Sequence, residues 1–378
     1  MSHLPIEFFA RREAELLALL GELVNCESPS TEKPAVDRLG RRLAEILGSL
    51  PGTVETVPQA QSGNHLLYRW GGDERPLLIL CHMDTVFDLG TAAQRPFRVE
   101  GERAYGPGVL DMKAGIAMAV TALRALHEAP GGPGLPVQML INSDEEIGST
   151  SSRALIEKLA AQARAVLVLE PATPSGAIKT SRKGVGDLMI ETQGTAAHAG
   201  AAHAEGRNAI EELAHHILAA QALTDYSRGT TVNVGVIRGG TRSNVVPDAA
   251  EAEVDFRVTQ MEEALRLKEW ARSRTPQVAG TGVRVRYELN RPPMPRDTLM
   301  EVCYAKAFAL AVQLGFFLNE EAVGGASDAN FVAPLGVPVL DGLGAVGDGA
   351  HSDREYILVP SLAERTALVA ALIQSWQE

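Results

Sequence analysis

The sequence predicts an α/β protein that carries a second, α+β domain as an insertion. The run 77–81 is short and apolar on both faces, as in a central parallel strand, and polar residues follow it directly. From about 184 to 295 the pattern changes to β-α-β-β-α-β, the order of the ferredoxin-like split motif. Because 378 residues exceed a usual single core, we expect one domain from 1–183 and 296–378, with 184–295 as the other.

Hydrophobic periodicity then places the individual elements. Apolar residues at helical spacing predict helices between Ile6 and Val24 and between Val36 and Leu47, separated by a Ser28-Pro29-Ser30-Thr31 break. The rest of the outer domain predicts strands near 53–58, 64–70, 77–81, 137–142, 165–169 and 337–340, and helices over 114–126, 298–314 and 361–376. The insertion predicts strands near 185–191, 232–236, 254–258 and 283–287, and helices over 206–222 and 260–273.

Composition and charge narrow the possible function classes. Hydrophobic residues make up 45% and charged residues 22%, and the net charge of −12 argues against nucleic acid or anionic membranes as partners. Three cysteines without a CxxC pair predict no disulfide framework and a reducing compartment. Charged residues interrupt the N-terminal apolar positions, and no apolar run approaches the ~18 residues of a membrane span, so we expect a cytoplasmic protein.

Histidine and acidic residues follow the strands of the outer domain. With similar residues in two glycine-rich loops, the set is His82, Asp84, Asp111, Glu145, Glu146, Glu170 and His351. Each alone has an ordinary explanation, such as a helix cap at Asp111 or an acidic first helical turn at Glu145. Because ligands of open α/β sheets bind outside the carboxyl ends of the strands, three strands that finish in histidine or acid predict a shared site.

The residue types of this set favour metal. Two imidazoles with several carboxylates suit zinc, with cobalt or manganese as substitutes. A single catalytic zinc takes three protein ligands, so the set is too large for one metal. It is about right for two metals with a bridging carboxylate and one acid left over.

Six segments, in order and over nearly the whole chain, resemble the co-catalytic di-zinc peptidase/aminoacylase family. That family includes glutamate carboxypeptidase, acetylornithine deacetylase, succinyl-diaminopimelate desuccinylase and aminoacylase. The segments are LCHMDTV, GPGVLDMKAG, SDEEIGS, LVLEPA, HAGAAHAEGRNAI and GAHSDREY. LEPA and GAHSD are most similar to the bacterial glutamate carboxypeptidases. The resemblance implies a mixed-sheet catalytic domain with helices on both faces and an insertion that serves as lid and dimerisation domain.

The resemblance also implies a role for each strand-end residue. Asp84 would orient His82, and the peptide bond between Asp111 and Met112 would be cis. Two Zn²⁺ would share a water and lower its pKa toward ~7, so that Glu145, the general base, takes its proton. The resulting hydroxide would attack the amide, and Glu145 would pass the proton to the leaving amine. The implied ligands are His82 and Glu170 for one metal, Glu146 and His351 for the other, and Asp111 as the bridge.

In the insertion, the resemblance implies that His198 is a lid histidine of a homodimer, which reaches the partner subunit's site and donates to the oxyanion. Asn244 matches a family asparagine that contacts substrate. Arg291 and Ser327 are candidates for binding the substrate carboxylate, because an arginine fork suits a bidentate carboxylate. Sheet edges of the insertion paired across a two-fold axis would make the dimer.

The sequence therefore predicts a zinc-dependent metallohydrolase that cleaves an amide next to a free α-carboxylate, as a glutamate-carboxypeptidase-like exopeptidase acting on small peptides. An N-acyl-amino-acid deacylase of the aminoacylase or deacetylase type, which cleaves the same kind of bond, stays open. A catalytically silent metal-binding scaffold has less support, because neither Glu145 nor any ligand is lost. A nucleotide-binding protein is set aside, since no GxGxxG follows a strand.

Overall fold

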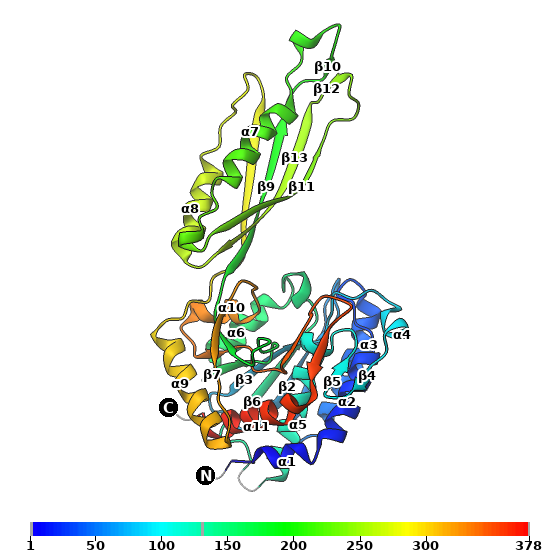
Figure 1. Ribbon diagram of the computed structural model, residues 1–378, viewed down its shortest axis with the longest axis vertical. Coiled ribbons are helices and arrows are strands. Elements are labelled where there is room, and N and C mark those ends of the chain that lie inside the picture. Colours follow the sequence, from blue (N-terminus) through cyan, green and yellow to red (C-terminus); the bar gives the residue numbers. More distant parts are fainter. Residues whose placement is uncertain (1–2, 130–131, 377–378) are drawn as a thin grey trace. The chain divides into compact units, whose positions relative to one another are not determined.

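The computed structural model describes residues 3–129 and 132–376, which divide into two compact units (Figure 1). The larger unit comprises Met1–Ser181, Arg296–Ala322 and Ser327–Glu378. The inserted unit comprises Arg182–Pro295 and Val323–Ala326. Its second segment, which the sequence pattern does not mark, belongs there because Val323 and Gly325 accept hydrogen bonds from Lys183 and Arg182 through their carbonyls.

The described residues of the larger unit form a six-stranded mixed sheet, as predicted. The strand order is β1 (Thr53–Val57), β2 (His65–Trp70), β6 (Val137–Asn142), β3 (Leu77–His82), β7 (Ala165–Val168) and β16 (Val339–Leu340). The pairs from β1 to β6 are antiparallel, and those from β6 to β16 are parallel. Since β3 is buried at every position and lies between two parallel neighbours, His82 ends a central strand.

Helices of the larger unit surround its sheet or pack on one another. They are α1 (Ile6–Ala10), α2 (Glu13–Asn25), α3 (Lys33–Gly48), α4 (Thr91–Gln94), α5 (Ala114–Glu128), α6 (Arg153–Gln162), α9 (Thr298–Leu314), α10 (Ala329–Val332) and α11 (Val359–Ser375). Leu77 and Ile79 join a core cluster with α2, α5 and α11, while Leu78 and Leu80, which point the other way, are also buried. Both faces of the sheet are therefore covered. The helix predicted between Ile6 and Val24 is two helices, because α1 turns to pack on α11 while α2 packs on α5.

A smaller sheet brings two distant loops together. Its order is β17 (Gly347–Asp348), β18 (Tyr356–Leu358), β5 (Arg103–Tyr105) and β4 (Arg98–Glu100), all antiparallel. The chain leaves β5 into the turn Val109–Lys113, which carries Asp111, and the loop between β17 and β18 carries His351. The remaining strands of this unit, β8 (Ile178–Arg182) and β15 (Glu320–Val323), pair with each other.

The inserted unit has the predicted ferredoxin-like order. Its antiparallel sheet runs β11 (Thr231–Gly239), β13 (Ala249–Val258), β9 (Gly184–Gln193) and β14 (Gly282–Arg291). The helices α7 (Ala209–Gln221) and α8 (Met261–Arg272) lie on one face (Figure 1), where side chains such as Leu188, Phe256 and Leu213 form a second core. At one end, two short strands pair, β10 (Ala197–His198) and β12 (Val245–Val246). Within the described part of the whole chain, no helix is long and apolar enough to cross a membrane.

Candidate metal centre

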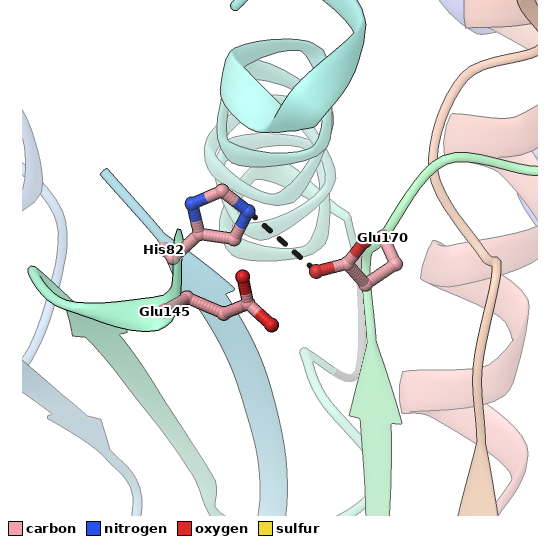
Figure 2. A group of neighbouring side chains, drawn as sticks. All are labelled: His82, Glu145 and Glu170. Atoms are coloured by element: carbon pink, nitrogen blue, oxygen red, sulfur yellow. Dashed lines mark ion pairs between the residues drawn. The ribbon is translucent and has the colours of Figure 1, made fainter. Parts of the chain in front are cut away.

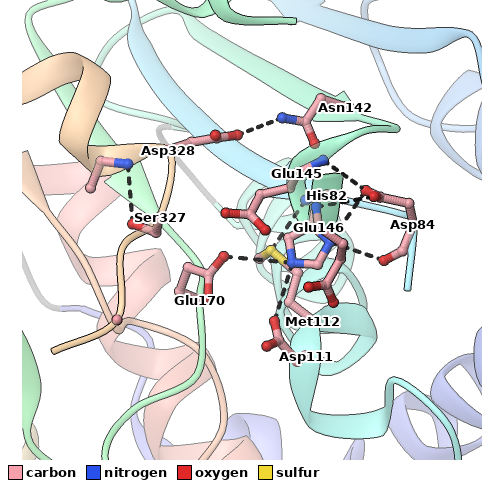
Figure 3. A network of polar contacts seen from close by, with 12 residues as sticks. His82, Asp84, Asp111, Met112, Asn142, Glu145, Glu146, Glu170, Ser327 and Asp328 are labelled. Atoms are coloured by element: carbon pink, nitrogen blue, oxygen red, sulfur yellow. Dashed lines mark hydrogen bonds and ion pairs between the residues drawn. The ribbon is translucent and has the colours of Figure 1, made fainter. Parts of the chain in front are cut away.

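Most of the predicted site residues lie together at the strand ends of the larger sheet (Figure 3). His82 ends β3, the turn Glu145–Ile147 follows β6, and Glu170 follows β7. Because β6, β3 and β7 are parallel neighbours, their carboxyl ends meet at the same edge. Asp111 and His351 reach this edge from the two loops of the smaller sheet.

His82 is buried, and its two ring nitrogens have separate tasks. Nδ1 lies 3.0 Å from the main-chain carbonyl oxygen of Asp84 and 3.5 Å from the carboxylate oxygen Oδ1 of the same residue. A carbonyl can only accept, so Nδ1 carries the donated proton and Nε2 is left to face a ligand. Nε2 lies 3.1 Å from Asp111 Oδ1 and 3.5 Å from Glu170 Oε1 (Figures 2 and 3).

Asp111 lies between the two histidines. Its second oxygen, Oδ2, is 3.2 Å from His351 Nε2, and the same nitrogen is 3.1 Å from Glu146 Oε2. Each carboxylate oxygen of Asp111 therefore faces a different imidazole, which is the arrangement that a bridging ligand needs. The Asp111–Met112 peptide bond is cis, which confirms that expectation, and His351 has a positive φ of 62°.

The carboxylates around these two histidines change the pKa values of the groups that they contact. Burial opposes protonation of His82, but hydrogen bonds to Asp111 and Asp84 raise its pKa well above the ordinary value. Hydrogen bonds to Asp111 and Glu146 raise the pKa of His351 to about 11. Burial opposes ionisation of Asp111, yet its hydrogen bonds to His351 and His82 hold its pKa well below the usual range. A cation is thus electrostatically favoured at each imidazole.

The residues present fit a metal site. Among the described residues, two ligand groups have atoms within 4.8 Å of one another: His82 with Glu145 and Glu170, and His82 with Asp111 and Glu146. The other carboxylate oxygen of Glu146, Oε1, is buried and has no hydrogen-bond partner among the residues that the structure describes. A buried oxygen of this kind is costly unless a cation or donor meets it. The mixed nitrogen and oxygen donors suit zinc.

Glu145 and Glu146 direct their carboxylates to different places. The carboxylate of Glu145 points toward the space between His82 and Glu170 (Figure 2), whereas that of Glu146 approaches His351. Their main-chain N–H groups both donate to the Asp84 carboxylate, at 3.2 Å each. Ser30, which sequence reasoning missed, also donates to this carboxylate through its hydroxyl, at 2.7 Å. Asp84 therefore holds the turn that carries the two glutamates, besides orienting His82.

The inserted unit brings together His198 and Asn244. His198 pairs with Val245 in the short β10–β12 ladder, and the carbonyl of Asn244 accepts the N–H of Ala199 at 3.0 Å. His198 Nδ1 accepts the N–H groups of Gly200 and Ala201, at 3.1 Å each. In the neutral ring the proton is therefore on Nε2, so the exposed side of the imidazole presents a donor.

The two residues predicted to bind the substrate carboxylate are both buried in their own units. Ser327 donates its hydroxyl to Asp341 Oδ2 at 2.6 Å and its N–H to Asn330 Oδ1 at 2.9 Å. A substrate contact through this hydroxyl therefore requires it to leave Asp341. Arg291 ends β14, and its Nη1 donates to Asn290 Oδ1 at 3.2 Å. Their role in substrate binding stays a prediction.

A carboxylate between two histidines at the carboxyl edge of a mixed sheet indicates a metal site. The chain belongs to peptidase family M20/M25/M40, whose model matches residues 78–375. It is an M20 family metallopeptidase/amidohydrolase, in agreement with the resemblance seen in its motifs.

Individual relatives and solved structures agree with this assignment. Carboxypeptidase G2 of Pseudomonas sp. is 33% identical over 368 residues, 95% of this chain and 88% of that protein. Succinyl-diaminopimelate desuccinylase of Rhodospirillum centenum is 27% identical over 388 residues, 95% of this chain and 97% of that protein. A tripeptidase from Staphylococcus aureus has the same fold, with a TM-score of 0.79 at 23% identity over 96% of this chain and 98% of that one.

Proposed function

We propose that this M20 metallohydrolase removes a C-terminal amino acid, with glutamate as the leading candidate, and binds two Zn²⁺ per subunit. The observation that carries the proposal is the position of Asp111, with one oxygen toward His82 and the other toward His351. The similarity to carboxypeptidase G2 supports the exopeptidase assignment. Co²⁺ and Mn²⁺ are possible substitutes for Zn²⁺.

The ligands fall into two sets that share Asp111. His82 and Glu170 would hold one cation, and Glu146 and His351 would hold the other. When bound, such a pair of cations supplies Lewis acidity, which polarises a carbonyl and lowers the pKa of water toward ~7. The Nδ1 contact of His82 to the Asp84 carbonyl leaves Nε2 free of that contact, so Nε2 is the nitrogen that would bind the cation.

Glu145 acts as the general base and then as the general acid. Its carboxylate takes a proton from the attacking water and delivers it to the nitrogen of the leaving amine, so the amide C–N bond breaks without free charge on the amine. Asp84 fixes the main chain of this glutamate and so limits how its carboxylate can move. His198, with its proton on Nε2, donates to the oxyanion that the attack creates.

We also propose that the protein is a homodimer. The inserted unit has exposed apolar side chains on α7 and on its edge strand β11, namely Ile210, Leu218 and Ile237. Pairing of this edge across a two-fold axis would cover them and leave His198 to serve the partner's site. Sedimentation that shows a fully active monomer would contradict this part of the proposal.

The test is zinc-dependent release of free glutamate from an N-acyl glutamate such as a folate analogue, measured beside N-acetyl amino acids. We expect Glu145→Ala to lower kcat by about 10²–10⁴-fold while two cations stay bound. Glu55→Ala, on the exposed strand β1, is the matched control and should keep full activity.

The same experiment separates the alternatives. Preferred turnover of N-acetyl or N-succinyl amino acids would favour a deacylase, which the similarity to desuccinylases and to acetylornithine deacetylase supports. No turnover of any substrate by the two-cation protein would favour the silent scaffold and overturn the proposed function.

A further inference from the structure

Glu355, four residues after His351, has no place in the chemistry described so far. Its side chain is buried, and both carboxylate oxygens accept main-chain N–H groups of one loop. Oε2 accepts the N–H of Gly108 at 2.8 Å, and Oε1 accepts those of Leu110 and Asp111 at 2.8 and 2.9 Å. The third of these donors belongs to the residue whose carboxylate lies between the two histidines.

The surrounding strands explain how one carboxylate can reach this loop. Tyr356, directly after Glu355, pairs with Tyr105 in the β18–β5 ladder. Beyond Tyr105 the chain enters the loop to Asp111, and before Tyr356 it comes from the loop with His351. Both loops therefore leave the same end of one ribbon, and Glu355 is the side chain that ties them together there.

We propose that Glu355 is a positioning residue of the metal centre, which sets the separation of Asp111 and His351 and thereby the affinity of the cation that these two residues share. The inference rests on the proposed function, because it assumes that the two residues bind a common cation. Residues that orient metal ligands in this way typically contribute about 10–100-fold to metal affinity or activity.

The chemistry of the contact requires a carboxylate. A carboxylate offers only acceptors, and three N–H donors converge on Glu355 from a single loop. An amide at this position keeps one oxygen but turns its NH₂ toward a main-chain N–H, so one donor loses its acceptor. An aspartate keeps both acceptor oxygens, but its side chain is shorter by one methylene, so the oxygens lie farther from the three N–H donors.

A second buried glutamate provides the control for a purely structural role. In the inserted unit, Glu212 accepts the N–H groups of Gln277 and Val278, at 2.9 and 2.7 Å, and the hydroxyl of Thr281 at 2.9 Å. It also contacts His216 Nε2 at 2.7 Å. Glu212 therefore accepts main-chain N–H groups as Glu355 does, in a part of the chain that carries none of the proposed metal ligands. Glu212→Gln should cost stability without changing the metal centre.

The experiment compares the full-length wild type, Glu355→Gln, Glu355→Asp and Glu212→Gln. Zn²⁺ affinity is measured by competition with a chromophoric chelator, and the centre is examined by the visible absorption of the Co²⁺-loaded proteins. We expect Glu355→Gln to weaken one of the two sites by about 10–100-fold and to alter the Co²⁺ spectrum, with kcat lowered more than KM is raised. The Zn²⁺ affinity of Glu355→Asp should lie between those of the wild type and Glu355→Gln. If Glu355→Gln does not fold, Glu355→Asp serves as the test in its place.

The possible outcomes distinguish a failure of this inference from a failure of the proposed function. If the wild type binds two Zn²⁺ and both Glu355 variants keep its affinity and Co²⁺ spectrum, the positioning role is wrong and the proposed function stands. If Glu212→Gln shifts the Co²⁺ spectrum as much as Glu355→Gln does, the effect is general destabilisation and the inference is wrong. A wild type that binds no Zn²⁺ would overturn both.

Discussion

The two units hold their candidate functional residues in different ways. In the larger unit, His82 is buried to 2% exposure at the end of a central strand, and a main-chain contact fixes the orientation of its ring. In the inserted unit, His198 is exposed on a two-residue strand, held by two N–H groups of the turn that follows it. The first arrangement is a preorganised cluster, and the second is a donor on a small exposed element.

This difference agrees with the different roles that we propose for the two units. Metal ligands must be placed to within a fraction of an ångström, so they belong on buried strands and on loops tied by several hydrogen bonds. The proposed oxyanion donor needs the correct tautomer, which the N–H groups of the turn after His198 favour. Changes to the proposed metal ligands of the larger unit should therefore alter metal content, whereas changes at the tip of the inserted unit should alter activity alone.

The largest effect is expected at Asp111. Asp111→Ala removes the carboxylate that we propose as the ligand shared by two cation sites, so both cations should be lost from the purified protein or bind only weakly. The loss of a general base lowers activity by about 10²–10⁴-fold, and the loss in this variant should be larger. Metal analysis after gel filtration checks this, and a variant that retains two tightly bound Zn²⁺ would contradict the bridging role.

The next effect separates the two units directly. His198→Ala should lower kcat by about 10²–10³-fold, the usual cost of one lost oxyanion donor, while the Zn²⁺ content stays that of the wild type. Loss of metal in this variant would show that the comparison between the units is wrong.

Mixing two inactive proteins tests whether His198 acts on the partner subunit. If it does, a hybrid dimer of Glu145→Gln and His198→Ala subunits has one complete site, and random exchange should restore roughly a quarter of wild-type activity. If His198 serves its own subunit, neither site of the hybrid is complete and mixing restores nothing. Each variant mixed with itself is the control.

The same contrast explains what the sequence could predict. The ends of β3, β6 and β7 follow from short apolar runs, so His82, Glu145 and Glu170 could be assigned to one edge of a sheet from periodicity alone. Asp111 and His351 lie on loops, where only the family motifs indicated their roles. The order of the inserted elements also followed from periodicity and the sheet confirmed it.

The contacts that hold the site have no comparable signature. Ser30 reaches Asp84 across 54 positions of the chain, and Glu355 reaches Gly108 across 247. Each is a hydrogen bond formed where two loops meet, and hydrophobic periodicity encodes no such meeting. Glu355 and Gly108 lie in the motifs GAHSDREY and GPGVLDMKAG, but those motifs did not indicate that the two residues contact each other. The direction of the Asp84 carboxylate was missed for the same reason, since its donors are main-chain N–H groups of a distant turn.

Ser30 provides a smaller test of the larger unit. Ser30→Ala removes one of the donors to the buried Asp84 carboxylate and should lower the free energy of unfolding by about 1.5–3 kcal/mol, as for a hydrogen bond to a charged group. Ser49→Ala, which removes a hydroxyl contact to a helix-end carbonyl, should cost less and serves as control. Urea unfolding measures both, and equal losses would show that Asp84 does not depend on Ser30.

The smallest effect concerns pH and His65, a buried histidine behind the Glu145–Glu146 turn. Its ring nitrogens contact the hydroxyls of Ser143 and Ser151, at 3.0 and 3.2 Å, and Ser151 in turn donates to Asp144 at 2.8 Å. Burial lowers the pKa of His65, so the folded chain holds this ring neutral where the unfolded chain protonates it.

The sign of the effect follows from that difference. Above the unfolded pKa of about 6.5 both states are neutral at this position and His65 adds no pH dependence. Below it the unfolded state binds the extra proton, so stability should fall as the pH is lowered, by at most about 1.4 kcal/mol per pH unit from this group. His65→Gln removes the titrating ring and should flatten the pH dependence of the midpoint of urea unfolding between roughly pH 6.5 and 5. If the midpoint of the variant falls with pH as steeply as that of the wild type, the folded chain does not keep the His65 ring neutral. The residues that support the turn with the two glutamates would then be in contact with more water than their buried hydrogen bonds indicate.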